Sequence, residues 1–255
     1  MQRTANPALN ESTFDHFDGY AAETSGVMTL QGTATKTGML CLLLAASAGF
    51  VWHELLKAGG IQGGGFQAVL PYVIGGLVVS LVAGLVIFWK AQWAAFLAPA
   101  YALGEGAVLG AISALYEERF HGIVFQAVCL TFGTLFSLLT CYRTGLIKPT
   151  ENFKLGVVAA TGGIALVYFA NIILSMFGVR MPFLHDASPI GIAINVVVLI
   201  VAALNLVLDF DFIDEGAKRG APKYMEWYAG YGLLVTLVWL YVEFLRLLSK
   251  LNSRD

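Results

Sequence analysis

The sequence predicts an all-α, polytopic membrane protein, a bundle of seven transmembrane helices. Hydrophobic residues make up 58% of its 255 residues, and charged residues make up only 13%. Soluble domains carry charges at about 25% of their positions. The mean hydropathy is +0.73. Seven mostly apolar stretches are each long enough, at about 20 residues, to cross the hydrocarbon core of a bilayer.

The first three stretches are separated by glycines and charges. The first runs over residues 37–56 and precedes a glycine-rich link at 59–65. The second covers 67–89, and the third covers 93–115 and ends before the charged run 117–119. Clusters of glycine or charge between apolar runs mark turns and loops. We therefore expect three helices joined by short connections.

Four further helices follow, with prolines in the links between them. Pro149 lies in one link, Pro182 and Pro189 lie in the next, and Pro222 precedes the last helix. Proline favours a helix boundary because it lacks the backbone donor that a helix interior needs. The expected ranges are 121–142, 155–177, 190–210 and 227–248.

Small residues are frequent in the third and fifth predicted helices. Glycines at membrane helix surfaces let two backbones approach closely. This predicts tight helix contacts at Gly104, Gly106 and Gly110, and also at Gly156, Gly162 and Gly163.

Three regions are predicted along the chain. Residues 1–35 are polar and form a flexible N-terminal tail, without the apolar core of a signal peptide. Residues 36–250 form one membrane domain, and residues 251–255 form a short C-terminal tail. No link between the helices has room for a soluble domain.

Basic residues are unevenly shared between the two sides of the predicted bundle. The side that holds the N-terminus carries nine Lys and Arg, whereas the loops of the other side carry three. Because basic loops stay in the cytoplasm, the N-terminus is predicted to be cytoplasmic. Seven spans then place the C-terminus outside, where Arg246, Lys250 and Arg254 run against the same rule.

Several function classes lack their sequence signatures. No basic patch indicates nucleic-acid binding, and no phosphate-binding glycine motif is present. Cys41, Cys129 and Cys141 have no metal-binding or redox spacing, so we expect buried free thiols and no cofactor. The Gly-x-Gly-Asp signature of an intramembrane aspartic protease is absent, and the seventh stretch has no lysine for retinal. We therefore expect no enzyme activity.

Two carboxylates inside the predicted helices are the strongest functional signal. Asp209 lies near the end of the sixth apolar stretch, and Glu243 lies deep in the seventh. A charge in the bilayer core costs about 2.5–3.5 kcal/mol on insertion scales, so such residues usually pair, bind a ligand or titrate. Asn205 shares the helix face of Asp209, and Arg246 shares that of Glu243. Two alternatives stay open: Asp209 is an interfacial acid, or Glu243 forms a local ion pair with Arg246.

A pairing of Asp209 with Glu243 would form a proton switch. Two carboxylates in a low-dielectric site share one proton, and together with Asn205 they would offer a weak calcium site. A plain hairpin of the last two helices would hold the two acids far apart. Pairing therefore requires a break or re-entrant part in residues 226–234, at glycines 230 and 232.

Two further acids are candidate supporting residues. Asp211 follows Asp209 but points to a different face of the helix. Glu105 lies midway along the third predicted helix, between Gly104 and Gly106. The flanking glycines leave room for another helix or for water beside the carboxylate. Alternatively, Glu105 forms a buried hydrogen bond that has only a structural role.

The sequences around Asp209 and Glu243 resemble a known family. The sixth helix ends in Leu208-Asp209-Phe210-Asp211-Phe212-Ile213, and an acidic and basic link, 214–223, follows it. The last helix reads Leu240-Tyr241-Val242-Glu243-Phe244, and the fourth ends in Tyr142-Arg143-Thr144-Gly145. On these motifs, residues 37–250 resemble the transmembrane Bax inhibitor motif family and are similar to its bacterial Bax-inhibitor-like members. Glu243 stands where the family has Asp, and Asp211 stands where it has Gln.

The resemblance implies a function for the two acids. In that family the acidic pair senses pH and gates a calcium leak through a seven-helix bundle, and these roles fall on Asp209 and Glu243. We therefore expect a pH-sensitive calcium (cation) leak channel in the lipid bilayer of a bacterial-type inner membrane, with Ca²⁺ as the permeant ion. The alternative is a non-transporting regulator of a membrane protease or another membrane partner. A proton-coupled transporter is a weaker alternative.

Overall fold

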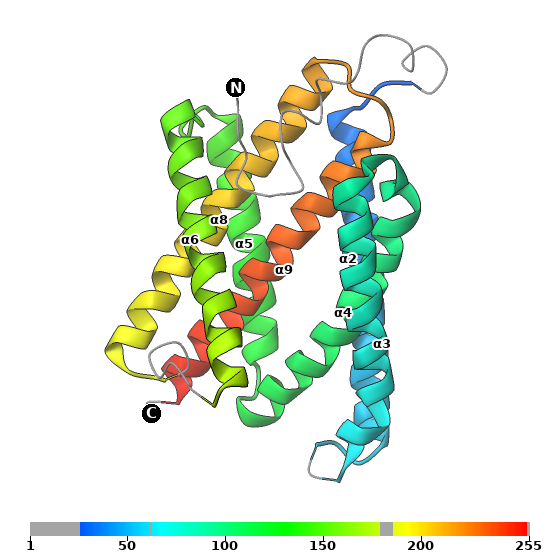
Figure 1. Ribbon diagram of the computed structural model, residues 1–255, viewed down its shortest axis with the longest axis vertical. Helices are drawn as coiled ribbons and strands as arrows, with labels where there is room; N and C mark the ends of the chain where they lie inside the picture. The colour runs from blue at the N-terminus through cyan, green and yellow to red at the C-terminus, as the bar shows by residue number, and fades with distance from the viewer. Residues whose placement is uncertain (1–25, 62, 179–185, 254–255) are drawn as a thin grey trace. The chain divides into compact units, whose positions relative to one another are not determined.

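The computed structural model describes residues 26–61, 63–178 and 186–253 (Figure 1). These residues contain seven α-helices that are each long and apolar enough to cross a membrane, which confirms the predicted fold class. They are α2 (Leu30–Lys57), α3 (Gly65–Trp89), α4 (Ala94–Arg119), α5 (Ile123–Arg143), α6 (Glu151–Met176), α8 (Pro189–Lys218) and α9 (Met225–Asn252), with the 3-10 helix η2 (Ala91–Trp93) before α4.

The first helix begins earlier than predicted. Residues 1–25 of the predicted tail lie outside the described residues, but α2 begins at Leu30, within the tail range of 1–35. Thr29 caps the helix: its backbone is extended, and its side chain accepts a hydrogen bond from the N–H of Gly32 at 3.0 Å. Such a cap satisfies a backbone donor that has no partner inside the helix.

The sixth predicted helix continues past its expected end. α8 runs to Lys218, eight residues beyond position 210. Two ion pairs support these last turns: Asp214 with Lys218 and Glu215 with Arg219. In each pair the two residues are one helical turn apart. With 30 residues, α8 is about 45 Å long and exceeds the thickness of a hydrocarbon core. Its acidic end can therefore reach the membrane surface.

The last helix has no break. α9 is continuous over Met225–Asn252, so the prediction of a re-entrant part at residues 226–234 is wrong. Gly230 serves close packing instead, because a Cβ atom there would lie 3.1 Å from the hydroxyl of Thr37 on α2. A glycine needed for a helix contact gives the same sequence signal as a glycine needed for a break.

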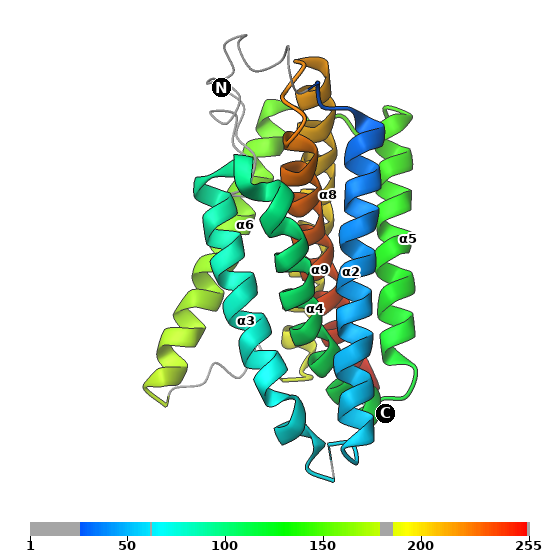
Figure 2. The same ribbon diagram turned by 90° about the vertical axis from the view of Figure 1, so that its right-hand side faces the viewer.

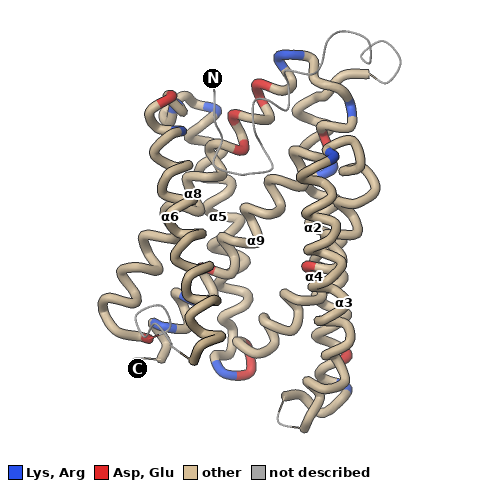
Figure 3. The backbone as a smooth tube through the Cα atoms, in the orientation of Figure 1, with Lys and Arg blue, Asp and Glu red and all other residues tan. Residues whose placement is uncertain are grey.

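The chain divides into two compact units. Unit 1 combines α5 and α6 with residues up to Phe212 of α8 and from Thr236 of α9, and unit 2 combines α2, α3 and α4 with residues 213–235. Each unit is compact by itself, and the prediction of one bundle over residues 36–250 stays a prediction. Charged residues gather near the helix ends (Figure 3).

In unit 2, glycines let three helices pack closely. α2, α3 and α4 lie side by side in both views (Figures 1 and 2), and each contacts the other two. A Cβ atom on Gly104 would lie 2.6 Å from the carbonyl oxygen of Gly76. Cβ atoms on Gly106 and Gly110 would overlap backbone atoms of α2. The predicted close contacts of this helix are therefore confirmed.

In unit 1, α6 is packed much less tightly than predicted. Cβ atoms on Gly156, Gly162 and Gly163 would have no neighbour within 4 Å, so these glycines make no close helix contact. The buried side chains of α6 are Lys154 and Val157, both near its start. Exposed apolar surface on a membrane helix can face lipid without cost, which explains how a helix with so few buried residues is tolerated.

The three cysteines are free, as predicted. They are not deeply buried: Cys41 and Cys141 are half-buried, and Cys129 is exposed on α5. An apolar stretch predicts a membrane helix, but it does not tell which side of that helix faces the other helices.

Candidate functional site

Glu243 is the centre of a buried polar cluster in unit 1. Its side chain is 1% exposed on α9. Three side chains from three helices donate hydrogen bonds to its carboxylate: Asn195 of α8 at 2.8 Å, Tyr168 of α6 at 3.1 Å and Arg246 of α9 at 2.9 Å. Both carboxylate oxygens are therefore bonded to neighbours, as a buried charge requires.

Arg246 is the partly exposed member of this cluster. Its guanidinium donates to the hydroxyl of Tyr168 at 3.0 Å, and its central carbon lies 5.3 Å from the centre of the same ring. The Arg246 side chain is 39% exposed, whereas Glu243 is enclosed. The ion pair of Glu243 and Arg246, an alternative that the sequence left open, is thus present, and Tyr168 and Asn195 extend it across two more helices.

Asn195 contributes both a donor and an acceptor. Its side chain is 3% exposed, and its Nδ2 atom donates to Glu243. Its Oδ1 atom is buried and has no hydrogen-bond partner among the described residues. This carbonyl oxygen can accept a bond from water or contact a cation. Further along α9, buried Lys250 donates to the carbonyl oxygen of Gly191 at 3.0 Å and fixes the start of α8.

An apolar groove lies beside the cluster, between α6 and α8. Its volume is about 660 Å³. It is lined on α6 by residues from Ala160 to Tyr168 and on α8 by residues from Ile190 to Val201. Over these turns α6 and α8 are therefore not in close contact, and the Tyr168 hydroxyl supplies the polar link to α9.

Asp209 and Asp211 lie toward the other end of α8. Asp209 is 1% exposed. Asp211 pairs with buried Lys154 of α6 at 2.7 Å and accepts a hydrogen bond from Tyr142 of α5 at 3.4 Å. Asn205 donates to the Thr161 hydroxyl on α6 at 2.8 Å. This second polar cluster ties the first half of α6 to α8.

The structure does not bring Asp209 and Glu243 together. Glu243 is bonded to Asn195, and Asp209 follows Asn195 by fourteen residues on the same unbroken helix. At 1.5 Å per residue, about 21 Å of α8 separates the two positions. The predicted proton-sharing pair is therefore wrong, because the straight α9 holds its acid beside the first half of α8.

The same separation removes the predicted calcium site. Asp209 and Glu243 cannot ligate one ion across that length of helix, since calcium–oxygen distances are about 2.3–2.6 Å. Among the described residues there is no group of three or more His, Cys, Asp or Glu side chains that could hold a metal. Of the predicted supporting residues, Arg246 touches Glu243, whereas Asn205 and Asp211 make their contacts toward the other end of α8. Glu105 belongs to unit 2.

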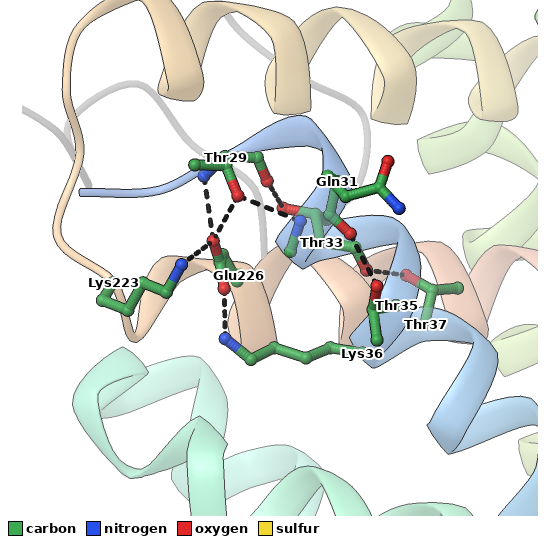
Figure 4. A network of polar contacts seen from close by, with 9 residues as sticks. Thr29, Gln31, Thr33, Thr35, Lys36, Thr37, Lys223 and Glu226 are labelled. Atoms are coloured by element: carbon green, nitrogen blue, oxygen red, sulfur yellow. Dashed lines mark hydrogen bonds and ion pairs between the residues drawn. The ribbon is translucent and has the colours of Figure 1, made fainter. Parts of the chain in front are cut away.

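A buried acid that the sequence did not single out anchors the start of α9. Glu226 is 0% exposed and lies in unit 2 (Figure 4). Its Oε1 atom accepts hydrogen bonds from the N–H and the hydroxyl of Thr29, both at 2.9 Å, and pairs with Lys223 at 2.7 Å. Its other oxygen pairs with Lys36 of α2. Two backbone hydrogen bonds, from the N–H of Met28 to the carbonyl of Ala221 and from the N–H of Lys223 to the carbonyl of Gly26, join the same two segments. We call residues 26–29 and 221–226, joined in this way, the strap.

Sequence reasoning missed three of these residues for different reasons. Asn195 stands alone within an apolar run, and an intramembrane amide is a usable signal for a buried hydrogen bond. Tyr168 and Glu226 carry little signal, because tyrosine is common at membrane interfaces and an acid is common in the first turn of a helix. Their roles depend on partners far away in the chain.

Comparison with known proteins places the chain in a family. The family model described as Bax inhibitor 1 like matches residues 6–253, nearly the whole chain. No curated protein matches the chain, and no solved structure does.

Proposed function

The chain belongs to the Bax inhibitor 1 like family of membrane proteins, and from this premise we propose that it is a pH-sensitive cation leak channel with Glu243 as its proton sensor. The observation that carries the proposal is the bonding of one buried carboxylate to three helices of unit 1. Ionisable side chains within membrane helices mark ion or proton pathways more often than they serve packing. Ca²⁺ is the proposed permeant ion.

Protonation of Glu243 weakens the cluster. All three donors point at the carboxylate, and hydrogen bonds to a charged acceptor are about twice as strong as bonds to a neutral one. A proton on Glu243 removes the attraction to Arg246 and occupies one of the oxygens. The half-exposed guanidinium can then turn toward water. The contacts are thus present when the acid is ionised and are lost as the pH falls.

The helix that responds to this loss is α6. Its buried residues, Lys154 and Val157, lie in its first two turns, where Asp211 also holds it. Its second half has the groove on one side and is linked to α9 through Tyr168. Loss of the Tyr168 bond would let this half of α6 move away from α9. The movement would expose Glu243 and the free oxygen of Asn195, two groups that attract a cation.

The orientation of the chain in the membrane is part of this proposal. We place the N-terminus in the cytoplasm of a bacterial-type inner membrane, from the excess of basic residues on that side. The C-terminal basic residues that opposed this rule have other roles: Arg246 is bonded to Glu243, and Lys250 is buried against Gly191. Arg254 lies outside the described residues.

The test is calcium flux into liposomes that contain the purified protein, measured with an enclosed calcium dye from about pH 5 to pH 8. For the wild type we expect flux to rise as the pH falls. Glu243→Gln should give a raised flux that no longer changes with pH. Tyr168→Phe should raise flux at neutral pH by a smaller factor, because one charge-assisted hydrogen bond is worth about 1.5–3 kcal/mol.

The matched control is Glu54→Gln, which removes a partly exposed acid paired with Lys57. This variant should keep the wild-type profile. If Glu243→Gln also keeps it, Glu243 is not the sensor. If the purified wild type passes no cation at any pH, the leak function itself is wrong, and regulation through a membrane partner becomes the better account.

A further inference from the structure

Glu105 is an acid at mid-depth in unit 2. It lies on α4, eleven residues after the first residue, Ala94, and fourteen before the last, Arg119. The carboxylate-bearing position is therefore about 16 and 21 Å along the axis from the two helix ends. These distances place it near the centre of a hydrocarbon core of about 30 Å.

The glycines beside Glu105 bring other helices close to it. A Cβ atom on Gly104 would lie 2.6 Å from the carbonyl oxygen of Gly76 on α3, and one on Gly106 would overlap the carbonyl of Leu44 on α2. The backbone of α4 thus packs against two helices at this level. The Glu105 side chain is half-buried among them.

Three hydroxyl groups surround the Glu105 carboxyl. Ser80 of α3, whose hydroxyl donates to the carbonyl oxygen of Leu77 at 3.2 Å, also lies within hydrogen-bonding reach of it, and Tyr101 and Tyr231 are close enough to interact with its charge. The two tyrosine rings meet edge to face, with their centres 4.8 Å apart. Gly84 leaves room for this arrangement, because a Cβ atom there would lie 3.0 Å from the Tyr231 hydroxyl.

In the part of the chain that the structure describes, no positive charge is paired with Glu105. The other span acids with contacts already described pair with lysine or arginine: Glu226 with Lys36 and Lys223, Asp211 with Lys154, and Glu243 with Arg246. Within residues 26–61, 63–178 and 186–253, no Lys, Arg or His forms an ion pair with Glu105.

The described residues of α2 and α3 bring no other charge to the level of Glu105. α3 has no Asp, Glu, Lys, Arg or His between Gly65 and Trp89. On α2, Lys36 lies about two turns before Leu44 and is bonded to Glu226, and His53 and Glu54 lie more than two turns after Leu44. α9, which carries Tyr231, has Glu226 more than one turn before that residue, and Glu226 is paired with Lys36 and Lys223. The titratable groups that interact with Glu105 are Tyr101 and Tyr231.

We propose that Glu105, Ser80, Tyr101 and Tyr231 form a reversible proton-binding site within unit 2, separate from the Glu243 cluster. A carboxyl in the bilayer core that has only hydroxyl neighbours is least costly when it carries a proton. The hydroxyls can donate to the ionised form and accept from the protonated one, so both states have hydrogen bonds. This inference does not depend on the leak function.

The test is covalent labelling of the full-length protein in lipid nanodiscs with the hydrophobic reagent N,N′-dicyclohexylcarbodiimide. A protonated carboxyl adds across a C=N bond of the reagent: its oxygen bonds to the central carbon and its proton moves to nitrogen. Rearrangement leaves a stable N-acylurea that peptide mass spectrometry locates. We expect an adduct on Glu105 that decreases by about tenfold per pH unit at the alkaline end of the titration.

Two variants and one control acid make the result decisive. Ser80→Ala removes a donor to the ionised form, so its labelling curve should shift to higher pH. Glu105→Gln should lose the adduct. A water-soluble carbodiimide should modify Glu54, which is partly exposed at the end of α2, in preference to Glu105.

Three outcomes would overturn the proposal. The first is no adduct on Glu105 at any pH, in either the wild type or Ser80→Ala. The second is labelling that does not change with pH. The third is an unshifted curve in Ser80→Ala, which would remove Ser80 from the site. Because labelling does not require transport, each outcome is separate from failure of the flux experiment.

Discussion

Glu226 and Glu243 are both enclosed acids of α9, yet their neighbours give them different properties. Glu226 pairs with two lysines and accepts two bonds from Thr29. Glu243 pairs with one arginine that is 39% exposed, and its other donors are the neutral Tyr168 and Asn195. The charge of Glu226 is thus more than compensated, whereas Glu243 forms an ion pair with one partly solvated arginine and has Lys250 as a further cation that interacts with its charge. Burial alone does not identify a titrating acid.

The two sites also differ in what they hold together. Backbone bonds run beside Glu226, from Met28 to Ala221 at 2.7 Å and from Lys223 to Gly26 at 3.2 Å. At Glu243 the links between helices are made by side chains, which can exchange partners without unfolding a helix. This difference supports the proposed switching role of Glu243 and a structural role for Glu226.

The largest expected effect comes from removing the charge of Glu226. Glu226→Gln leaves Lys36 and Lys223 facing a neutral group, and breaking a buried ion pair costs about 3–5 kcal/mol. Thermal unfolding in detergent should show a clear loss of stability. Glu243→Gln should be less destabilising, because the freed Arg246 can reach water. If Glu226→Gln lost less thermal stability than Glu243→Gln, Glu226 would not be the structural acid of the two.

A glycine pair on α2 gives a smaller and more local effect. A Cβ atom on Gly32 would overlap the Glu226 carboxylate, whereas one on Gly38 would have no neighbour within 4 Å. Gly32→Ala should cost about 1–3 kcal/mol through overpacking, and Gly38→Ala should gain up to about 1 kcal/mol from helix propensity. The same unfolding assay measures both. Equal stability of the two variants would mean that Gly32 does not support the strap.

The helices were predictable from the sequence, but several of their contacts were not. Runs of about 20 apolar residues determine where membrane helices form, because every backbone polar group must be bonded inside the bilayer. The end of α8 was missed because its last turns are polar and depend on the pairs of Asp214 with Lys218 and Glu215 with Arg219. The apolar pattern of the sequence does not indicate where a helix continues into polar turns.

The candidate site was predictable only in part. The local ion pair of Glu243 with Arg246, which the sequence left open as an alternative to pairing with Asp209, is present. The pairing with Asp209 failed because it required a break in α9, and Gly230 packs against Thr37 instead. Tyr168 and Asn195 come from other helices, and no local pattern ties them to Glu243. Residue types locate polar groups in a membrane helix, whereas packing decides which of them meet.

The most direct test of the central claim is the distance between α6 and α8 as Glu243 takes up a proton. Spin labels at Ile172→Cys and Ile200→Cys, both at exposed positions, would report it by pulsed electron resonance after the three native cysteines are replaced by serine. We expect the distance distribution to widen or lengthen as the pH falls. Glu243→Gln should give the low-pH distribution throughout. A wild-type distribution that stays the same from about pH 5 to pH 8 would contradict the account.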